Sequence, residues 1–520
     1  MIRPARPKDR PLSGLGDLLF GKAPNSGGVI SGVTHDSRRV RPGDLYVALP
    51  GERAHGAAFS AGAVAAGAAA ILTDPAGRDR AAACGVPVFV VASPRERLGD
   101  VACWIHGDPS TRMRLIGVTG TSGKTTTTYL LESGLRAAGH VTGLIGGVET
   151  RIAGERSGSA LTTPEATDLQ ALLAVMVERG VTAAAMEVSS HALALGRVAG
   201  TRYDVAVFTN LSQDHLDFHP DMEAYFAAKA QLFTRRYAGV GVVNADDGYG
   251  RRLASEAPIP VTTFAVASGS AIRDADWQAV DVRSGSDGST FRVIGPGGVQ
   301  ADVSVRLPGV FNVSNTLGAL VALVEAGVRL EDAVAGVAAC PGPPGRLERV
   351  DGGMPDVFVD YSHKPGAVQA VLGALRPVTQ GNLIIVLGCG GDRDRAKRPL
   401  MGAAAAELAD VAILTSDNPR SEDPLAILAE MLQGALAVPG RERARVIIEP
   451  DRADAIDRAV GMAGKGDVVL VAGKGHERGQ NVGGTVLPFD DREVTAAALR
   501  RWAERDRMPG AAPLDDGGGL

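Results

Sequence analysis

A glycine-rich turn at residues 116–127 combines the residue types that bind phosphate, with the sequence IGVTGTSGKTTT. The pattern predicts an apolar strand before the turn, over 113–118, and a helix after it, over 125–138. Glycines let backbone N–H groups approach an anion, a helix N-terminus favours negative charge, and Lys124 adds a point charge. The hydroxyl of Thr125 suits Mg²⁺. The turn therefore predicts a protein that binds and uses ATP.

The turn departs from the common phosphate-loop pattern at one position. Val118 stands where that pattern has its first glycine, and the shorter spacing Gly120-x-x-Gly123-Lys124-Thr125 replaces it. Gly-Lys-Thr turns also arise by chance in long chains. The order of strand, turn and helix favours nucleotide binding over chance.

Two more polar segments that follow apolar runs contain candidate metal ligands. Lys229 lies further along the chain. Residues 186–191 (MEVSSH) place Glu187 where it can help to bind Mg²⁺, although a surface glutamate at a strand end is the alternative. Residues 208–219 (FTNLSQDHLDFH) include His215, a metal-ligand candidate whose alternative is an ordinary loop histidine. Lys229 lies on a predicted amphipathic helix and, on its residues alone, is expected to face solvent.

Composition excludes several classes of protein. The chain has 520 residues, 45% of them hydrophobic and 22% charged, which predicts more than one globular domain. A net charge of −5 without a long basic run argues against nucleic-acid binding. The four cysteines are scattered, which argues against a zinc site or disulfide framework and favours a reducing cytoplasm. We expect neither a secretory signal nor a membrane span.

Alternating apolar runs and helical segments predict an α/β fold of three domains. These are a small α/β N-terminal domain, a central mononucleotide-binding domain of the phosphate-loop type with a parallel sheet, and a C-terminal Rossmann-like domain. Within the central domain, short alternating runs over 260–306 predict a small antiparallel insertion. The predicted boundaries are 1–25 for a poorly ordered N-terminus, 26–110, 111–342 and 343–505 for the three domains, and 506–520 for a disordered tail.

Taken together, these segments resemble the Mur ligase family, in its MurE branch, over about residues 26–505. Members of that branch add the third residue of the peptidoglycan stem to a UDP-N-acetylmuramoyl dipeptide. The motifs that carry the resemblance occur in the family's order: 120–126, 162–164, 187–191, 210–215, Lys229, 312–315, 345–346, 360–365, 388–399, 417–420 and 473–477.

The resemblance implies where ATP and magnesium bind. It implies ATP contacts at Gly120, Thr121, Ser122, Gly123, Lys124, Thr125, Thr126, Asn312, Asn315, Arg346 and Asp360. It implies that Mg²⁺ is held by Thr125, Glu187, His215 and a Lys229 whose amine has been carboxylated by CO₂. Carboxylation requires a neutral amine, and burial lowers the pKa of lysines in general. The catalytic residues implied are Lys124, Lys229, His215 and Arg346, and domain closure over the nucleotide is expected.

The resemblance also implies two substrate sites. Contacts to the UDP-MurNAc-dipeptide are implied for His35, Ser37, Glu52, Arg53, Ala54, Thr162, Thr163, Ser189 and Arg197. Contacts to diaminopimelate are implied for Arg393, Asp417, Asn418, Pro419, Arg420, Gly473 and Glu477. Diaminopimelate has a second carboxylate that lysine lacks, and Arg420 is able to pair with it. Glu477 suits the distal ammonium.

We therefore expect an amide ligase that works through an acyl phosphate, on small-molecule substrates and as a monomer. The alternatives are a lysine-adding relative, a ligase of the MurF or folylpolyglutamate synthetase type, and a non-catalytic nucleotide sensor or scaffold. The motif at 417–420 argues against the other ligases, and the retained Lys124, Glu187, His215 and Lys229 argue against the scaffold. The residues leave meso- and LL-diaminopimelate equally open.

Overall fold

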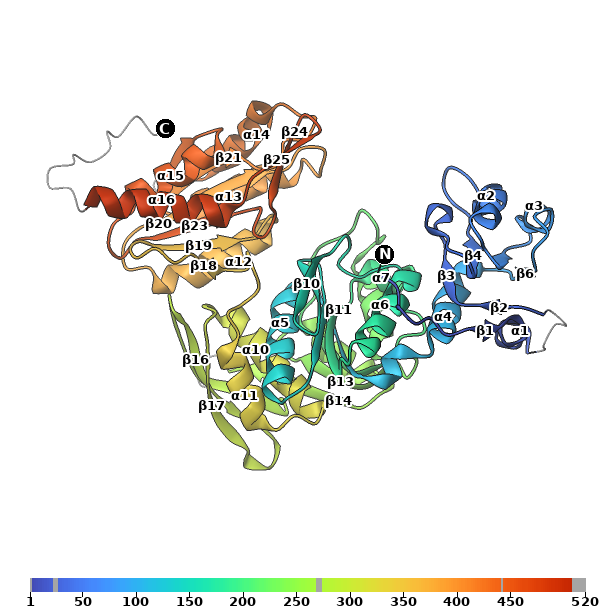
Figure 1. The fold of residues 1–520 in the computed structure, drawn as a ribbon. Helices are drawn as coiled ribbons and strands as arrows, with labels where there is room; N and C mark the ends of the chain where they lie inside the picture. Colours follow the sequence, from blue (N-terminus) through green and yellow to red (C-terminus); the bar gives the residue numbers. More distant parts are fainter. Residues whose placement is uncertain (1, 22–26, 268–273, 441–442, 507–520) are drawn as a thin grey trace. The chain divides into compact units, whose positions relative to one another are not determined.

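The computed structural model describes residues 2–21, 27–267, 274–440 and 443–506 (Figure 1). The chain divides into two compact units, described separately below. The first comprises residues 1–280, 293–301 and 314–340, and the second comprises 281–292, 302–313 and 341–520. In the described ranges, none of the helices combines the length and the apolar character needed to cross a membrane.

The first unit begins with a small parallel sheet in the strand order β3-β4-β5-β6. Successive residues of β4 point to opposite faces, so Leu45 and Val47 join one core while Tyr46 and Ala48 join another. Helices therefore cover both faces. The strands are β3 (Gly32–Thr34), β4 (Asp44–Ala48), β5 (Ala70–Thr73) and β6 (Val88–Val90), and the helices are α1 (Leu12–Phe20), α2 (Ser60–Ala65), α3 (Arg78–Ala82) and α4 (Pro94–His106).

The N-terminal segment is folded, which corrects the expectation of poor order for 1–25 over the described part, 2–21. Strand β1 (Arg10–Pro11) pairs antiparallel with β2 (Val29–Ile30), and α1 follows it directly. Leu12 and Leu15, three residues apart on one helix face, are buried in the core of the small sheet. Arg3 forms an ion pair with the buried Asp44 at 2.6 Å. Residues 22–26 and most of the predicted tail, 507–520, lie outside the described residues.

A second sheet, most of whose strands belong to this unit, carries the phosphate loop at the end of β7. Its order is β10-β9-β8-β11-β7-β12-β13-β14-β15-β16-β17, parallel from β8 to β15 with β9 and β10 antiparallel at one edge. The strands are β7 (Arg114–Thr119), β8 (Thr142–Ile145), β9 (Glu149–Ile152), β10 (Glu155–Gly158), β11 (Ala183–Glu187), β12 (Tyr203–Phe208), β13 (Ala238–Asn244), β14 (Val261–Val266), β15 (Trp277–Gly285), β16 (Gly288–Ile294) and β17 (Gln300–Val305).

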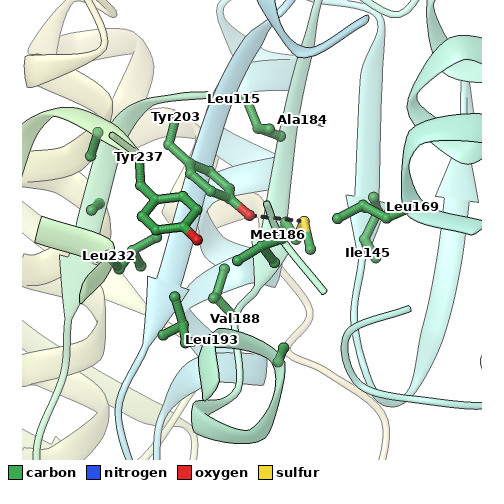
Figure 2. Packing of buried hydrophobic residues seen from close by; sticks show 14 of the residues in the cluster. Leu115, Ile145, Leu169, Ala184, Met186, Val188, Leu193, Tyr203, Leu232 and Tyr237 are labelled. Atoms are coloured by element: carbon green, nitrogen blue, oxygen red, sulfur yellow. Dashed lines mark hydrogen bonds between the residues drawn. The ribbon is translucent and has the colours of Figure 1, made fainter. Parts of the chain in front are cut away.

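Seven helices of the described residues belong to this region, and α5 is buried on all sides from Thr125 to Leu135. They are α5 (Lys124–Ala137), α6 (Ala166–Glu178), α7 (Ser190–Ala194), α8 (Met222–Ala230), α9 (Gly248–Glu256), α10 (Val310–Glu325) and α11 (Leu330–Ala339). One core cluster joins the strands to α6, α7 and α8. Figure 2 shows Tyr203 and Tyr237 packed in it, with the Tyr203 hydroxyl 3.6 Å from Met186 Sδ. This packing fixes the strand ends from which the polar loops emerge.

The segment 260–306 extends the large sheet, and its first strands pair in parallel, so the prediction of a small antiparallel insertion is wrong for β14 and β15. Strand β14 pairs in parallel with both β13 and β15. Phe264 and Trp277 are buried where β14 meets β15, and Phe291 and Val293 of β16 are buried too. The alternation of buried and exposed side chains fits a strand with one covered face whether the sheet is separate or shared. The pattern therefore identified strands and could not identify their partners.

The second unit contains a sheet in the order β18-β19-β23-β20-β21-β22, parallel except for β18. Ile385 and Leu387 of β20 pack with α12, α13 and α14, while Ile384 and Val386 pack with α15 and α16. The sheet is therefore doubly wound. The elements are β18 (Glu348–Arg349), β19 (Asp356–Asp360), β20 (Leu383–Cys389), β21 (Val411–Ser416), β22 (Arg445–Ile448), β23 (Val468–Ala472), the hairpin β24 (Gly479–Val482) and β25 (Thr485–Pro488), α12 (Pro365–Leu375), α13 (Lys397–Leu408), α14 (Pro424–Ala437), α15 (Arg452–Met462) and α16 (Asp491–Asp506).

The burial of α1 can be tested by truncating one side chain. Leu15 is fully buried, so Leu15→Ala should lower the free energy of opening of the first sheet by about 2–5 kcal/mol. Native-state hydrogen exchange of the β4 amides measures this quantity. Phe20→Ala on the same helix is the control, because Phe20 is 48% exposed and should cost clearly less. Equal, small effects of both variants would contradict the packing of α1.

Candidate functional site

The phosphate loop connects β7 to α5 and requires its glycines. Gly120 has φ 147° and Gly123 has φ 86°, both in the region that favours glycine. A Cβ on Gly120 would lie 1.9 Å from Thr209 Oγ1, and one on Gly123 would lie 2.3 Å from Asn315 Oδ1. Asn315, assigned to ATP from the sequence, therefore lies against the loop.

The end of the neighbouring strand β12 holds the loop in place. Thr121 N donates to Asn210 O at 2.9 Å, and Ser122 N donates to Asn210 Oδ1 at 3.0 Å. The Thr209 hydroxyl donates to Ser122 O at 2.6 Å. Sequence analysis gave Thr209 and Asn210 no role, although their position at a strand end beside β7 was a usable signal.

The side chain of Lys124 folds over its own loop. Its Nζ donates to the carbonyl oxygens of Gly120 at 2.9 Å and Thr121 at 2.8 Å. The positive charge thus lies within the turn whose N–H groups and helix N-terminus favour an anion.

Glu187 and Thr125 form an oxygen pair beside the loop. Glu187 is 2% exposed, which excludes the alternative of a surface glutamate. Its Oε1 accepts from Thr125 Oγ1 at 3.1 Å and from Gly147 N at 3.0 Å. A buried carboxylate next to a hydroxyl at a phosphate loop has the donor chemistry that Mg²⁺ prefers.

His215 lies in a loop of histidines and aromatic residues. It has φ 53° and its Nε2 lies 3.2 Å from Asp214 Oδ2. The centroid of its ring is 4.7 Å from that of His191 and 6.2 Å from that of Tyr225. Among the residues that the structure describes, no group of three or more His, Cys, Asp or Glu is placed to hold a metal.

Lys229 is buried, contrary to the expectation from its helix alone. It is 1% exposed, its Nζ donates to Gly120 O at 2.8 Å, and it lies 4.6 Å above the centroid of the Tyr225 ring. Tyr225, Phe226 and Ala228 are also buried on α8, so the covered face of this helix is wide. The partner of Lys229 is the phosphate loop, which lies 109 residues earlier in the sequence.

Some residues assigned to the muramoyl substrate lie around Glu187. Thr163 Oγ1 donates to Glu187 O at 3.0 Å and accepts from Ser189 N at 3.1 Å. A Cβ on Gly147 would lie 3.0 Å from Thr162 Oγ1, which places Thr162 at the same edge. Three residues assigned from sequence thus meet at the ends of β8 and β11.

The remaining muramoyl residues lie toward the small sheet. Arg197 forms an ion pair with Glu165 at 2.8 Å. His35 Nδ1 lies 3.2 Å from Thr167 Oγ1, and burial lowers the pKa of His35. Ser37 begins a short helical turn whose N-cap is Asp36. Exposed positions are occupied by Glu52, Arg53 and Ala54.

In the second unit, two of the residues assigned to ATP lie beside the first two strands of the doubly wound sheet. Arg346 precedes β18, and Asp360 is the last residue of β19. Asp360 is buried and accepts from Leu347 N at 2.7 Å and Ser362 N at 2.8 Å. The Arg346 guanidinium lies 4.3 Å from the centroid of the Tyr361 ring. The side chain of Asn312 donates to Pro308 O at 2.9 Å.

The residues assigned to diaminopimelate gather at the carboxyl ends of β21 and β23. Asn418 Nδ2 donates to Asp417 Oδ1 at 2.8 Å and to Glu477 Oε2 at 2.9 Å. A Cβ on Gly473 would lie 2.7 Å from Asp417 Oδ2, so this glycine allows a close approach. Burial raises the pKa of Asp417, and the charges of Arg452 and Lys474 oppose that rise.

The two arginines of this set border the same glycine. A Cβ on Gly390 would lie 2.9 Å from Arg420 Nη1 and 3.9 Å from Arg393 Cγ. Arg420 has φ 53°, and its Nη1 donates to Gly391 O at 2.6 Å. The carbonyl oxygen of Pro419 packs against Gly391, where a Cβ would lie 1.9 Å away. Cationic and acidic groups thus lie at one edge of the sheet, on the loops that follow β20, β21 and β23.

Comparison with known proteins identifies the family. Residues 29–104 match the Mur ligase family catalytic domain, 118–323 the Mur ligase middle domain, and 345–475 the Mur ligase glutamate ligase domain. A protein of Streptomyces coelicolor, named UDP-N-acetylmuramoyl-L-alanyl-D-glutamate--2,6-diaminopimelate ligase, is 59% identical over 500 residues. The alignment covers 96% of this chain and 98% of that protein. The chain belongs to the Mur ligase family.

Other Mur ligases extend the comparison. A protein of the same name from Corynebacterium glutamicum is 48% identical, over 90% of this chain and 92% of its own length. The UDP-N-acetylmuramyl-tripeptide synthetase of Leifsonia xyli is 47% identical, over 96% of this chain and 98% of its own length. A solved structure of a diaminopimelate ligase aligns with a TM-score of 0.68 and 33% identity, covering 93% of this chain and 98% of that one. The predicted three-domain α/β fold is therefore confirmed.

One buried lysine of this Mur ligase was missed by sequence analysis. Lys474 is fully buried, and its Nζ donates to Asn418 Oδ1 at 3.2 Å, Glu477 Oε2 at 3.1 Å and Gly479 O at 2.7 Å. It lies inside the motif 473–477, which was its only sequence signal. Lys474 links two residues assigned to diaminopimelate.

The phosphate loop of this Mur ligase can be tested by adding one methyl group. Gly123→Ala would combine a positive φ with a clash against Asn315, so ATP affinity should fall at least about tenfold. Gly139→Ala is a matched control at the other end of α5, with φ 85° and no atom within 4 Å of the added Cβ. Isothermal titration with ATP separates them. Equal losses of affinity would show that backbone strain alone is responsible and would contradict the close approach.

Proposed function

We propose that this chain catalyses the ATP-dependent ligation of diaminopimelate to UDP-N-acetylmuramoyl-L-alanyl-D-glutamate, a step of peptidoglycan synthesis. The supporting observation is the edge of the sheet at which Arg393 and Arg420 border Gly390, while Asp417 and Glu477 lie in the loops after the neighbouring strands. Arginines suit the second carboxylate of diaminopimelate, and acids suit its ammonium groups. The name of the 59% identical Streptomyces coelicolor relative supports the same substrate pair.

The reaction proposed proceeds in two balanced steps. The γ-carboxylate of the D-glutamyl residue attacks the γ-phosphorus of ATP, which forms an acyl phosphate and releases ADP. The amine of diaminopimelate then attacks the acyl carbon, loses a proton and displaces inorganic phosphate. Positioning and charge neutralisation account for most of such catalysis. We assign charge neutralisation to Lys124, and the position of its ammonium in the phosphate loop supports this role.

Magnesium fits the first unit, and we assign it to Thr125, Glu187, His215 and Lys229. Bound Mg²⁺ would neutralise phosphate charge during transfer. The fit rests on the buried oxygen pair of Thr125 and Glu187, 3.1 Å apart. Carboxylation of the Lys229 amine by CO₂ would supply a further acidic group. A carbamate nitrogen keeps one N–H, so the bond from Lys229 to Gly120 O is compatible with it.

The muramoyl dipeptide is assigned to the first unit. Thr162, Thr163 and Ser189 supply hydroxyl groups beside Glu187, and His35 and Ser37 lie on the small sheet. ATP and UDP-linked sugars are found in the cytoplasm, so we propose that the enzyme acts there. We also assign ATP contacts to four residues, as the family resemblance implies: Arg346, Asp360, Asn312 and Asn315.

A substrate panel tests the proposed function. Phosphate release should require ATP, Mg²⁺ and UDP-MurNAc-L-Ala-D-Glu together with meso- or LL-diaminopimelate, and should be much slower with L-lysine. Lys124→Ala should reduce turnover by at least about a thousandfold, since it removes charge stabilisation of the transferred phosphoryl group. Turnover with lysine at the same rate would replace the diaminopimelate assignment with a lysine-adding one. Turnover that D-alanyl-D-alanine supports and neither diaminopimelate nor L-lysine supports would favour a MurF-type ligase. ATP binding without turnover would favour a scaffold.

Carboxylation of Lys229 has a spectroscopic test. Protein equilibrated with ¹³C-bicarbonate should show one carbamate resonance by ¹³C NMR, and Lys229→Gln should remove it. Lys474→Gln is the matched control, because Lys474 is the other fully buried lysine among the largest buried side chains and should leave the resonance intact. A resonance that survives Lys229→Gln, or none in the unaltered protein, would refute the assignment.

A further inference from the structure

A buried arginine beside the amino-acid pocket has no role in the function proposed above. Arg398 is the second residue of α13, and its side chain is 0% exposed. Its Nη1 donates to Glu422 Oε2 at 2.9 Å, and its Nη2 donates to Glu422 Oε1 at 2.7 Å. This is the bidentate geometry in which arginine pairs are strongest and most directional. Nη1 also donates to Glu430 Oε2 at 3.1 Å.

Arg398 bridges the two loops that carry the pocket arginines. Its Nη2 donates to Gly390 O at 3.3 Å, in the loop that follows β20 and carries Arg393. Glu422, its main partner, lies in the loop that follows β21 and carries Arg420. One buried side chain therefore holds both loops.

The loops also bind one another through groups that Arg398 orients. Glu422 Oε1 accepts from Asp392 N at 2.6 Å, so the carboxylate held by Arg398 also holds the first loop. Ser421 Oγ donates to Asp392 Oδ1 at 2.6 Å, and Gly391 N donates to Asn418 O at 2.9 Å. The spacing between the loops depends on a network with Glu422 at its centre.

The backbone of these loops needs such support. Asp392 and Arg420 both have φ 53°, a conformation that is unfavourable for a residue other than glycine and persists when its surroundings fix it. Hydrogen bonds from Arg398 lower the pKa of Glu422 to about 2, so the pair remains charged across any practical assay pH.

We propose that Arg398 is a positioning residue that sets the separation of Arg393 and Arg420, and thereby the preference for an amino acid with a distal carboxylate. The inference rests on the proposed function, since that carboxylate is the group that distinguishes diaminopimelate from lysine. A site built to pair with a polar group discriminates strongly only if its donors are held in the correct geometry.

The test is Arg398→Lys, which keeps the charge and loses the bidentate pair. The KM for diaminopimelate should rise roughly ten- to a hundredfold, because small misplacements of binding groups have effects of that size. The KM values for ATP and the muramoyl dipeptide should stay unchanged. The ratio of kcat/KM for diaminopimelate to that for L-lysine should fall, a change that a merely structural role would not produce.

Two further variants keep the test decisive. Glu422→Gln should also raise the KM for diaminopimelate and lower the ratio of kcat/KM for diaminopimelate to that for L-lysine. It tests the proposal by itself if Arg398→Lys fails to fold. Combined with Arg398→Lys it should add little, since residues of one network are not additive. Arg501→Ala is the control and should shift neither quantity, because Arg501 pairs only with a residue outside this network, Asp457, and its side chain is 53% exposed.

The possible outcomes separate this inference from the proposed function. Unaltered protein that turns over no diaminopimelate isomer would refute both. Diaminopimelate turnover by the unaltered protein, with a selectivity ratio that Arg398→Lys and Glu422→Gln leave unchanged, would refute only the positioning role. Equal rises in all three KM values would also refute it, because they would indicate general damage to the fold.

Discussion

The carbonyl oxygen of Gly120 is the acceptor on which the nucleotide site depends. It receives hydrogen bonds from Lys124 at 2.9 Å and from Lys229 at 2.8 Å, so two ammonium groups meet at one atom. Like charges this close raise the free energy of the site, and an arriving anion lowers it. Conversion of Lys229 into a carbamate would replace this repulsion by attraction and would leave an N–H for the same carbonyl. The two ammonium groups at this carbonyl thus favour a bound phosphate.

The position of that carbonyl is set by strand ends and not by the loop alone. Gly120 adopts φ 147° beside Thr209, and Asn210 binds the next two residues of the turn. Both residues emerge from β12, which pairs in parallel with β7. The carboxyl ends of parallel strands lie at one edge of a sheet. The phosphate loop after β7 and Glu187 at the end of β11 therefore lie close together, and Lys229 reaches the loop from α8. The second unit uses the same arrangement at β20, β21 and β23.

Local patterns in the sequence predicted the parts of the molecule whose causes are local. The strand, turn and helix at 113–138, and the doubly wound pattern after 343, follow from apolar runs and glycines that lie close together in the chain. The burial of Lys229 was not predictable in this way, because its acceptor is 109 residues away. Nor were the partners of β15 and β16, since alternation shows a covered face and not what covers it. The family resemblance supplied most site residues, while Arg398 and Lys474 had no separate signal.

Buried cations oppose the rise in pKa that burial gives to Asp417 in the amino-acid site. These cations are Arg452 and Lys474. Arg452 is itself held by Asp491 at 2.8 Å, with neither side chain exposed, so it remains fixed beneath the strand ends. Removing one partner of such a pair costs about 3–5 kcal/mol, which constrains the pair as a unit. Arg452, Lys474 and Arg398 all lack solvent exposure, and each contacts a residue or backbone group of the pocket loops. The selectivity of the pocket is therefore a property of this buried scaffold as much as of the side chains that would touch the substrate.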